Sequence, residues 1–333
     1  MKTIILFTFT IGLILIPECF PTIAAQTQAD EVRIGAWNIE WLGFPDKRAR
    51  PGKDNPQRPE DLAEYIHSTG VDVLALEEIG VDADKSPWTS QELELLQRAF
   101  LDKYQERWSY VIFPKTSYPE DTEDFVKRGQ HLAIAWKSEK ATQVGGVFDI
   151  PVGGDETYGI KFFERRANAV KLSFGEGKTD VVFIPVHLKS NRNDDNPADK
   201  TFTQRQRAAE LKAFVAQLPK LKEHFKDDDI VLLGDTNILG DEDTANVLTE
   251  AAFVDLNRDE QGTTAVWGDG SNGYRTAPFD RIFIPQTQSE FAESRFQVHR
   301  TSNGTDDEIK LFRRKLSDHY LISSVIKIQS DDD

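Results

Sequence analysis

Short apolar runs recur along the chain, and most of them have the length of β-strands. Some alternate apolar and polar residues and others are continuously apolar, which is typical of strands buried on one face or on both. We therefore predict a fold dominated by strands. The eight clearest runs are VRIGAWN (32–38), VDVLALEE (71–78), HLAIAW (131–136), NAVKLSF (168–174), TDVVFIPVH (179–187), IVLLGD (230–235), FDRIFIP (279–285) and YLISSVIKI (320–328).

Between some of these strands, apolar residues recur at the spacing of amphipathic helices. Thr89 with Glu92 has the form of a capping box, and Thr203 with Gln206 gives a similar start signal. Strands in runs with helices on their outer faces indicate an α/β fold, a four-layer sandwich in which helices flank two stacked mixed β-sheets. The predicted helices span residues 59–69, 90–101 and 204–218.

The first 25 residues are predicted to be a signal peptide rather than part of this fold. Lys2 precedes an apolar run that is too short and too poorly flanked for a membrane span, and Ala24 and Ala25 follow it. This is the layout of a secretory leader that is cleaved near Ala25. No obvious linker divides residues 26–333, so we expect one secreted domain with a short acidic tail, in the extracellular space or the periplasm.

Composition restricts the possible disulfides and the possible modes of substrate binding. The only cysteine, Cys19, lies in the leader, so the mature chain forms no internal disulfide. A net charge of −16 argues against a protein that grips nucleic acid by bulk electrostatics, but it leaves room for local basic patches and a metal ion. Basic residues cluster within 45–58, 189–192 and 313–315, next to predicted strand ends. We expect a monomer without stable membrane association after the leader is removed.

Polar side chains stand at the ends of most of the predicted strands. A single carboxylate or histidine in such a place is a weak signal, but together these groups point to one cleft at one edge of the sheets. Carboxylates suit hard divalent cations, and histidines exchange protons near neutral pH. The residues are Asn38, Glu77, Glu78, His187, Asp235, Asn237, Asp280, Asp318 and His319.

The order of these motifs, W-N, L-x-E, H, G-D-x-N, D-R-I and S-D-H, resembles the endonuclease/exonuclease/phosphatase superfamily over residues 32–328. That superfamily includes pancreatic deoxyribonuclease, abasic-site endonucleases, sphingomyelinases and inositol-polyphosphate phosphatases. The resemblance implies a two-sheet sandwich flanked by helices, in agreement with the apolar pattern. It also implies hydrolysis of phosphate esters with Mg²⁺, for which Mn²⁺ or Ca²⁺ are the expected substitutes.

The resemblance implies a metal site built from oxygen ligands. Glu78 stands in the place of the ligating glutamate, with Asn38 contacting the metal directly or through water and Asp318 helping to bind it. Glu77 stands where glutamine is usual. We expect it to point away from Glu78, if the strand alternates, and to form supporting hydrogen bonds.

The resemblance also assigns catalytic roles. Asp235 orients or deprotonates the attacking water, and Asn237 holds that water and a phosphate oxygen. His319 contacts the phosphoryl oxygen or acts as an acid/base, and Asp280 holds its other ring nitrogen. His187 protonates the leaving group or stabilises charge on the phosphate.

Substrate contacts are expected from His187, Asn237 and a central-strand arginine. Arg166 matches the phosphate-binding arginine of the superfamily, with Arg165 as the alternative. Gln130 is the candidate partner of His187 and is the fourth residue expected in the substrate-binding set.

The other histidines have simpler interpretations. His67 lies in the last turn of a helix, and His224 is expected to be exposed in a charged stretch. His299 is expected on a strand surface, whereas His131 lies close enough to the cleft to be ambiguous.

A secreted endonuclease that cuts DNA, with RNA left open, is the function favoured by the leader and the basic clusters. The alternatives are a phospholipid-directed phosphodiesterase resembling sphingomyelinase and a phosphomonoesterase of small esters. A sphingomyelinase-like enzyme should carry an exposed apolar hairpin, and the sequence shows none. A binding module that has lost catalysis is disfavoured because the set of motifs is intact.

Overall fold

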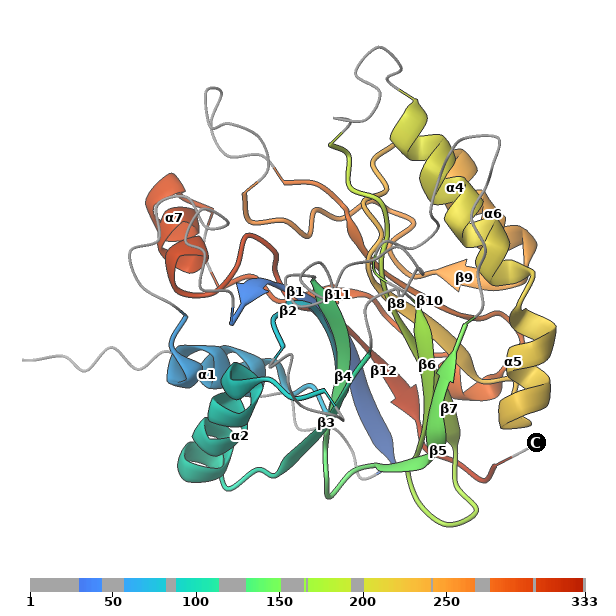
Figure 1. Ribbon diagram of the computed structural model, residues 1–333, viewed down its shortest axis with the longest axis horizontal. Coiled ribbons are helices and arrows are strands. Elements are labelled where there is room, and N and C mark those ends of the chain that lie inside the picture. The colour runs from blue at the N-terminus through green and yellow to red at the C-terminus, as the bar shows by residue number, and fades with distance from the viewer. Residues whose placement is uncertain are drawn as a thin grey trace, which may run out of the picture.

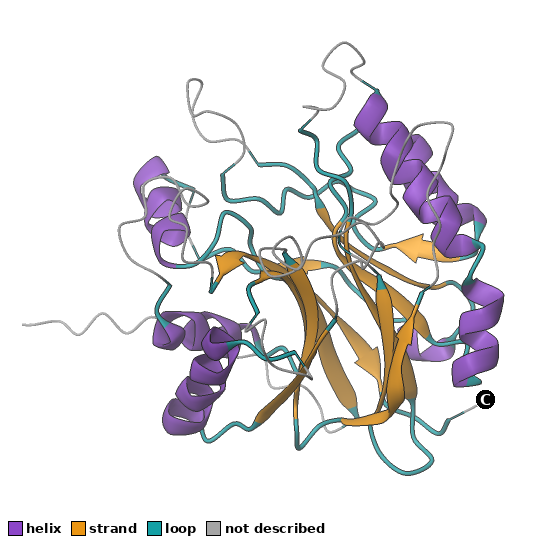
Figure 2. Ribbon diagram, viewed as in Figure 1, coloured by secondary structure: helices purple, strands orange, loops and turns teal. Residues whose placement is uncertain are grey.

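Two six-stranded sheets pack face to face at the centre of the fold, with helices on their outer sides (Figures 1 and 2). The computed structural model describes residues 30–43, 57–81, 88–113, 130–150, 165, 167–192, 201–240, 242–266, 276–301 and 304–331. The first sheet has the order β11 (Gln297–Val298), β12 (Ile322–Lys327), β1 (Glu31–Leu42), β2 (Val73–Ile79), β4 (His131–Lys137), β3 (Trp108–Ile112). The second has the order β5 (Thr142–Asp149), β6 (Asn168–Ser173), β7 (Asp180–His187), β8 (Ile230–Asp235), β10 (Asp280–Pro285), β9 (Phe253–Asp255).

Both sheets are mixed, and each has one parallel pair that helps to build the cleft. β1 runs parallel to β2 in the first sheet, and β7 runs parallel to β8 in the second. Their other pairings are antiparallel. All eight strands predicted from the apolar runs are present, and the predicted four-layer arrangement is confirmed.

The core has three layers, one between the sheets and one under each group of helices. Alternate residues of β8 show why its apolar run is continuous. Val231 and Leu233 pack between the sheets, whereas Ile230 and Leu232 pack under the helices of the second sheet. A strand that is buried on both faces has no polar side to alternate with.

Six α-helices cover the outer faces among the described residues. Their contributions to the core are one-sided, as the amphipathic spacing requires. Helices α1 (Pro59–Thr69), α2 (Gln91–Tyr104) and α7 (Asp306–Lys315) lie on the side of the first sheet, and α4 (Phe202–Val215), α5 (Leu218–Phe225) and α6 (Glu242–Glu250) lie on the side of the second (Figure 1). None of the described helices is long and apolar enough to cross a bilayer. The predicted leader, residues 1–25, lies outside the described residues.

Two predicted helix boundaries are wrong. The N-cap of α2 is Ser90 rather than Thr89, so Glu92 occupies the second helical position and the predicted capping box does not form. The segment predicted as one helix over 204–218 is two helices. The first begins at Phe202, and the second begins at Leu218, where Pro219 fits a first turn but not a helix interior.

His299 is not the surface residue that the sequence predicts. It follows β11, it is half-buried, and its Nε2 lies 2.7 Å from Ser323 Oγ. Burial and the nearby positive charge of Arg33 lower the pKa of His299 to about 4. The folded state therefore favours the neutral imidazole.

We expect this histidine to make the fold sensitive to acid. Its folded-state pKa of about 4 lies below the unfolded value of 6.5, so the unfolded state binds the proton more readily and stability is lost as pH falls from about 6.5 to 4. In urea unfolding at pH 7 and pH 4.5, the wild type should lose about 2 kcal/mol more than His299→Gln. An equal loss in both proteins would contradict this assignment.

Candidate active site

Strand pairing brings the predicted polar residues to one edge of the sheets. His187 at the end of β7 is the register partner of Asp235 at the end of β8, and Asp235 is in turn the partner of Asp280 at the start of β10. In the first sheet, Asn38 is the partner of Glu77. Residues far apart in sequence therefore become neighbours because the strand pairing places them at the same edge of the sheets.

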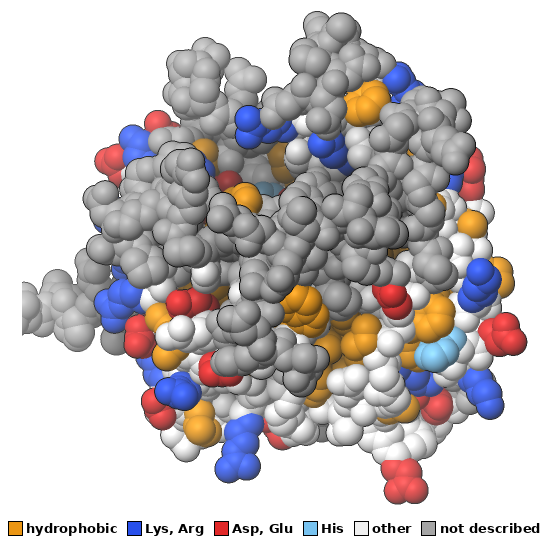
Figure 3. Space-filling view, viewed as in Figure 1, with side chains coloured by type: hydrophobic (Ala, Val, Ile, Leu, Met, Phe, Trp, Pro, Cys, Tyr) orange, Lys and Arg blue, Asp and Glu red, His pale blue; other side chains and the backbone are white. Residues whose placement is uncertain are grey.

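These residues surround a pocket of about 220 Å³. A space-filling view shows a hollow on this face, with basic side chains and a histidine beside it (Figure 3). Asp280 is fully buried behind the pocket, next to His319. The predicted residues that line the pocket itself are Asn38, Glu78, His187, Asp235, Asn237, Asp318 and His319.

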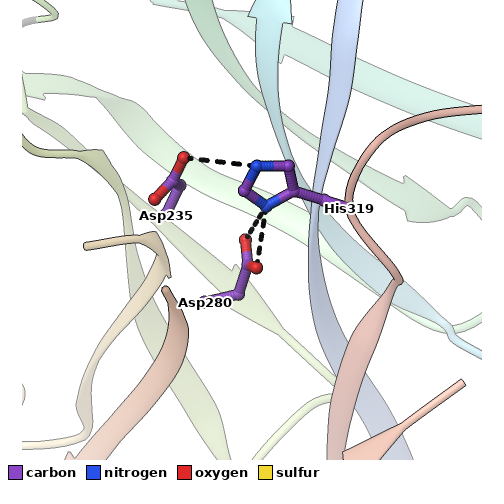
Figure 4. A group of neighbouring side chains, drawn as sticks. All are labelled: Asp235, Asp280 and His319. Carbon is purple, nitrogen blue, oxygen red and sulfur yellow. Dashed lines mark hydrogen bonds and ion pairs between the residues drawn. The ribbon is translucent and has the colours of Figure 1, made fainter. Parts of the chain in front are cut away.

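Asp280, His319 and Asp235 form a chain of charged contacts (Figure 4). The Nδ1 atom of His319 lies 2.8 Å from Asp280 Oδ2, and its Nε2 lies 3.9 Å from Asp235 Oδ2. Burial opposes protonation of the ring, but the carboxylates of Asp280 and Asp235 outweigh it and raise the pKa of His319 well above its usual range. Thr263 Oγ1 donates to Asp280 Oδ2 at 2.5 Å and so fixes the carboxylate that orients the ring.

Asp235 is held from three sides. Its Oδ1 accepts from the main-chain N–H of Asn237 at 3.0 Å, and its Oδ2 accepts from Asn38 Nδ2 at 3.1 Å. His187 Nε2 lies 3.4 Å from the same Oδ2. Burial raises the pKa of Asp235, and the neighbouring charge of Asp280 adds to the shift. A carboxylate fixed between two imidazoles can orient a water molecule and accept its proton.

The glycine of the G-D-x-N motif is required by close packing. Gly234 has φ of 137°, and a Cβ atom there would lie 2.2 Å from the carbonyl oxygen of Val186 and 2.6 Å from Glu77 Oε1. Asn237 has φ of 53°, a left-handed conformation that asparagine adopts more readily than most residues. The motif is therefore a tight turn that lets β7, β8 and β2 approach one another directly behind Asp235.

His187 is buried and has a different environment from His319. Burial, with the nearby positive charge of Arg165, lowers its pKa well below the usual range. Its Nδ1 has no hydrogen-bond partner among the described residues. The predicted partner, Gln130, instead accepts a hydrogen bond from Arg165 Nη1 at 3.0 Å, so that part of the prediction is wrong.

Arg165 forms hydrogen bonds that fix the main chain at the end of β7. Its Nε donates to the carbonyl of His187 at 3.0 Å, and its Nη2 donates to the carbonyl of Leu188 at 2.8 Å. The Leu188 carbonyl also accepts from Asn237 Nδ2 at 3.3 Å. All three guanidinium nitrogens thus bond to protein oxygens, so Arg165 positions the site in this structure rather than facing a substrate. Arg166 lies outside the described residues.

Glu78 is turned toward the pocket by a break in its strand. It has φ of 63°, and the pairing of β2 with β1 and β4 shifts register around it. Its Oε1 accepts from Asn38 Nδ2 at 3.2 Å, and its Oε2 accepts from the main-chain N–H of Trp41 at 3.1 Å. Burial and repulsion by Asp318 raise the pKa of Glu78 to about 8.

Glu77 differs from its prediction. It does not line the pocket, as expected, but neither of its buried carboxylate oxygens has a hydrogen-bond partner among the described residues. The predicted role as a hydrogen-bonding support is therefore wrong. Burial, with repulsion from Asp280 and Asp235, raises its pKa well above the usual range.

The donor set fits a hard divalent cation. Glu78, Asp235 and Asp318 line one pocket, where burial raises the pKa values of the first two and like charge from Asp318 and Asp280 adds to the shifts. Ligand atoms of Asp235, Asp280 and His319 also lie within 4.8 Å of one another, an arrangement consistent with a divalent metal site. Carboxylate oxygens are the ligands that Mg²⁺ prefers.

Asn38 is better placed to support this site than to ligate a metal directly. Its Oδ1 accepts from the main-chain N–H of Glu40 at 3.1 Å, which fixes the orientation of the carboxamide. Its Nδ2 then faces the carboxylates of Glu78 and Asp235. In this conformation a contact with a metal would pass through water, the second of the two predicted modes.

Several residues of the site are absent from the predicted set. Thr263 gives no sequence signal, because its contact with Asp280 depends on a loop that packs from elsewhere in the chain. Arg313 belongs to a basic run that the sequence does show, but only the structure separates it from its neighbours. The lining residues outside the predicted set are Glu40, Trp41, Ser190, Thr264, Val266, Phe279 and Arg313.

His131, which the sequence leaves ambiguous, is a core residue. It is 1% exposed, its Nδ1 lies 3.1 Å from the carbonyl oxygen of Phe113, and its ring packs against Trp88. It does not line the pocket.

Comparison with known proteins identifies a family and a fold. A profile of the Endonuclease/Exonuclease/phosphatase family matches residues 35–319. A search of curated proteins finds no match.

Three solved structures are similar along nearly their whole length. D. rerio TDP2 complexed with a single-strand DNA product is 16% identical, with a TM-score of 0.56 over 89% of this chain and 99% of that chain. The catalytic domain of human nocturnin with bound sulfate is 15% identical, with a TM-score of 0.52 over 90% and 95%. A Bacteroides vulgatus endonuclease/exonuclease/phosphatase is 12% identical, with a TM-score of 0.55 over 90% and 99%. At these identities the likeness shows the fold alone.

Proposed function

The chain belongs to the endonuclease/exonuclease/phosphatase family, and we propose that it is a secreted, Mg²⁺-dependent endonuclease that hydrolyses phosphodiesters of DNA. Membership makes it a metal-dependent phosphoesterase, and the choice of DNA and of a pancreatic-deoxyribonuclease-like branch is the proposed part. The observation that carries the proposal is the meeting of Asp235, His187 and His319 beside Glu78 in one pocket.

In this proposal Glu78 is the principal metal ligand, with Asp318 beside it and Asn38 joined through water. When bound, Mg²⁺ neutralises charge that develops on the phosphate. The protein supplies the positioning. Asn38 bridges Glu78 and Asp235, so the metal ligand and the group that handles water are tied together.

The remaining residues act on water and on the phosphate. Asp235 orients the attacking water and accepts its proton, while Asn237 holds the water and a phosphate oxygen. His319, fixed through Nδ1 by Asp280, presents Nε2 to the phosphoryl oxygen. His187, whose Nε2 also lies near Asp235 Oδ2, stabilises charge on the phosphate or protonates the leaving group.

DNA is preferred to the other phosphate esters for two reasons. The similar D. rerio TDP2 structure contains a single-strand DNA product, which supports nucleic acid as the substrate class. Basic clusters lie next to the strands that carry the site residues. Most of the cluster in 45–58 lies outside the described residues. Local positive charge of this kind contacts backbone phosphates in proteins whose overall charge is negative.

A comparison of substrates tests the choice. The mature protein should nick supercoiled plasmid with Mg²⁺ and not with EDTA, and it should hydrolyse sphingomyelin and p-nitrophenyl phosphate more slowly. Faster hydrolysis of sphingomyelin would favour the phospholipid-directed alternative, and faster hydrolysis of p-nitrophenyl phosphate would favour a monoesterase. Failure to hydrolyse any of them would contradict the proposal.

We also propose export as a monomer after cleavage of residues 1–25. Mass spectrometry of the secreted product should show a chain that starts near Gln26 and lacks Cys19. An intact N-terminus, or a lipid on Cys19, would contradict cleavage at this site.

A further inference from the structure

Helix α7 is held against the first sheet in a fixed rotation. Thr305 and Glu308 form a capping box at its start, and Phe312 is buried at its other end. The Phe312 ring packs against Tyr65 and Tyr320, with centroid separations of 5.3 and 4.7 Å. With Phe312 directed into the core, the next residue along the helix is directed toward the pocket.

That next residue is Arg313. Its Nη2 and Nε lie 3.2 and 3.4 Å from Glu40 Oε1, and its Nη2 lies 3.9 Å from Asp318 Oδ2. The side chain is 26% exposed, so it is anchored and still accessible from the pocket. Arg314, one position later, is exposed and does not line the pocket.

Acidic side chains outnumber basic ones among the described residues that line the pocket. The carboxylates of Glu40, Glu78, Asp235 and Asp318 line it, and they repel a phosphate chain. Of the described lining residues, Arg313 is the only lysine or arginine. Glu40 engages the guanidinium through one oxygen, and Nη1 makes no hydrogen bond to the described residues, so donors remain for a phosphate.

Arg313 lies to one side of the reacting centre rather than at it. Its hydrogen bonds and ion pairs among the described residues are with Glu40 and Asp318, and none is with Asp235, His187 or His319. Its link to Asp235 runs through Glu40, whose main-chain N–H donates to Asn38 Oδ1, and then through Asn38 Nδ2, which donates to Asp235. A phosphate that reaches Arg313 is a neighbour of the phosphate that is cleaved.

We propose that Arg313 binds the phosphate next to the scissile one, and that it makes a polynucleotide a better substrate than an isolated phosphodiester. The inference rests on the proposed nuclease function. It assigns Arg313 to substrate binding, with Glu40 as the residue that positions it. A polynucleotide carries a phosphate at each nucleotide, whereas bis(p-nitrophenyl) phosphate offers no second one for Arg313 to bind.

The test compares Arg313→Gln, Arg313→Lys and the matched control Arg314→Ala on plasmid DNA and on bis(p-nitrophenyl) phosphate. Arg313→Gln removes the charge but keeps a donor for Glu40. It should lower kcat/KM for DNA about tenfold, mainly by raising KM. For the small ester it should lower kcat/KM by no more than about twofold. It should also reduce the salt slope of DNA affinity by roughly one. Arg313→Lys should be intermediate. Arg314→Ala removes an exposed charge of the same basic run that does not line the pocket, so its effect on DNA should be clearly smaller than that of Arg313→Gln.

Equal losses on both substrates, no loss on DNA, or an equal effect of Arg314→Ala would overturn the inference. Circular dichroism checks the fold, and Arg313→Lys carries the test if the glutamine variant is unfolded. Anisotropy of a labelled oligonucleotide in EDTA separates this inference from the proposed function. If the wild type does not cleave DNA but binds it more tightly than Arg313→Gln does, the nuclease function is rejected and the phosphate-binding role of Arg313 stands. If neither protein binds the oligonucleotide, or both bind it equally, the role of Arg313 is rejected.

Discussion

His319→Ala is expected to lower the turnover of DNA by a factor on the order of a hundred or more. The ring joins two carboxylates, with Nδ1 2.8 Å from Asp280 and Nε2 3.9 Å from Asp235. Alanine removes the group that the proposed mechanism places against the phosphoryl oxygen, and it leaves Asp280 without its imidazole partner. The effect should appear in kcat, measured at saturating plasmid DNA and Mg²⁺.

Two variants make this result specific. Asp280→Asn should lower kcat in the same direction, because it weakens the charged contact that orients His319. His67→Ala removes a histidine that pairs with Glu106 away from the pocket, so its kcat should stay within about twofold of the wild type. Near-normal turnover in His319→Ala with an unchanged circular dichroism spectrum would contradict the proposed role.

Glu78→Gln is expected to weaken Mg²⁺ binding and to lower activity by a factor on the order of a hundred at low Mg²⁺. Glu78 is the carboxylate that a local break in β2 turns into the pocket, where Asn38 and the main chain of Trp41 fix its oxygens. Glutamine keeps the size and loses the charge, so higher Mg²⁺ or Mn²⁺ should restore part of the activity. Calorimetric titration with Mg²⁺ gives a readout independent of turnover.

Glu77→Gln is the matched control for this prediction. Glu77 does not line the pocket, and burial with the neighbouring carboxylates raises its pKa, so an uncharged amide of the same size is a mild replacement there. Its Mg²⁺ affinity and activity should change by no more than a few-fold, a small effect expected for a near-isosteric change. A larger effect in Glu77→Gln than in Glu78→Gln would show that the assignment of the metal ligand is wrong.

Much of the fold could be predicted because buried strands leave a strong apolar signal. The apolar pattern misses elements in which this signal is weak. β5 is mostly exposed and contains Gly145 and Gly146, so neither alternation nor a continuous apolar run develops. α7 is mostly charged, and its apolar stripe is only Ile309 and Phe312 with Leu316 after the helix, so the signal in its sequence is short.

The candidate site could be predicted for those residues that lie at strand ends. His187, Asp235 and Asp280 meet because three neighbouring strands share a register, and a polar residue at each strand end is visible in the sequence. The contact from Thr263 could not be predicted, because it depends on how a loop folds back on the sheet. The conformation of Glu78 likewise depends on a register shift that pairing with both neighbours imposes.

Cleavage of supercoiled plasmid by the mature protein, with Asp235→Asn beside it, is the most direct test of a phosphodiesterase centre at Asp235. The wild type should convert supercoiled DNA to the nicked form with Mg²⁺, and EDTA should stop the reaction. Asp235→Asn should be slower by a factor on the order of a hundred or more, because an amide can still bond to Asn237 but does not accept a proton from water. Intact plasmid after incubation with the wild type and Mg²⁺, or undiminished nicking by Asp235→Asn, would contradict this function for the pocket.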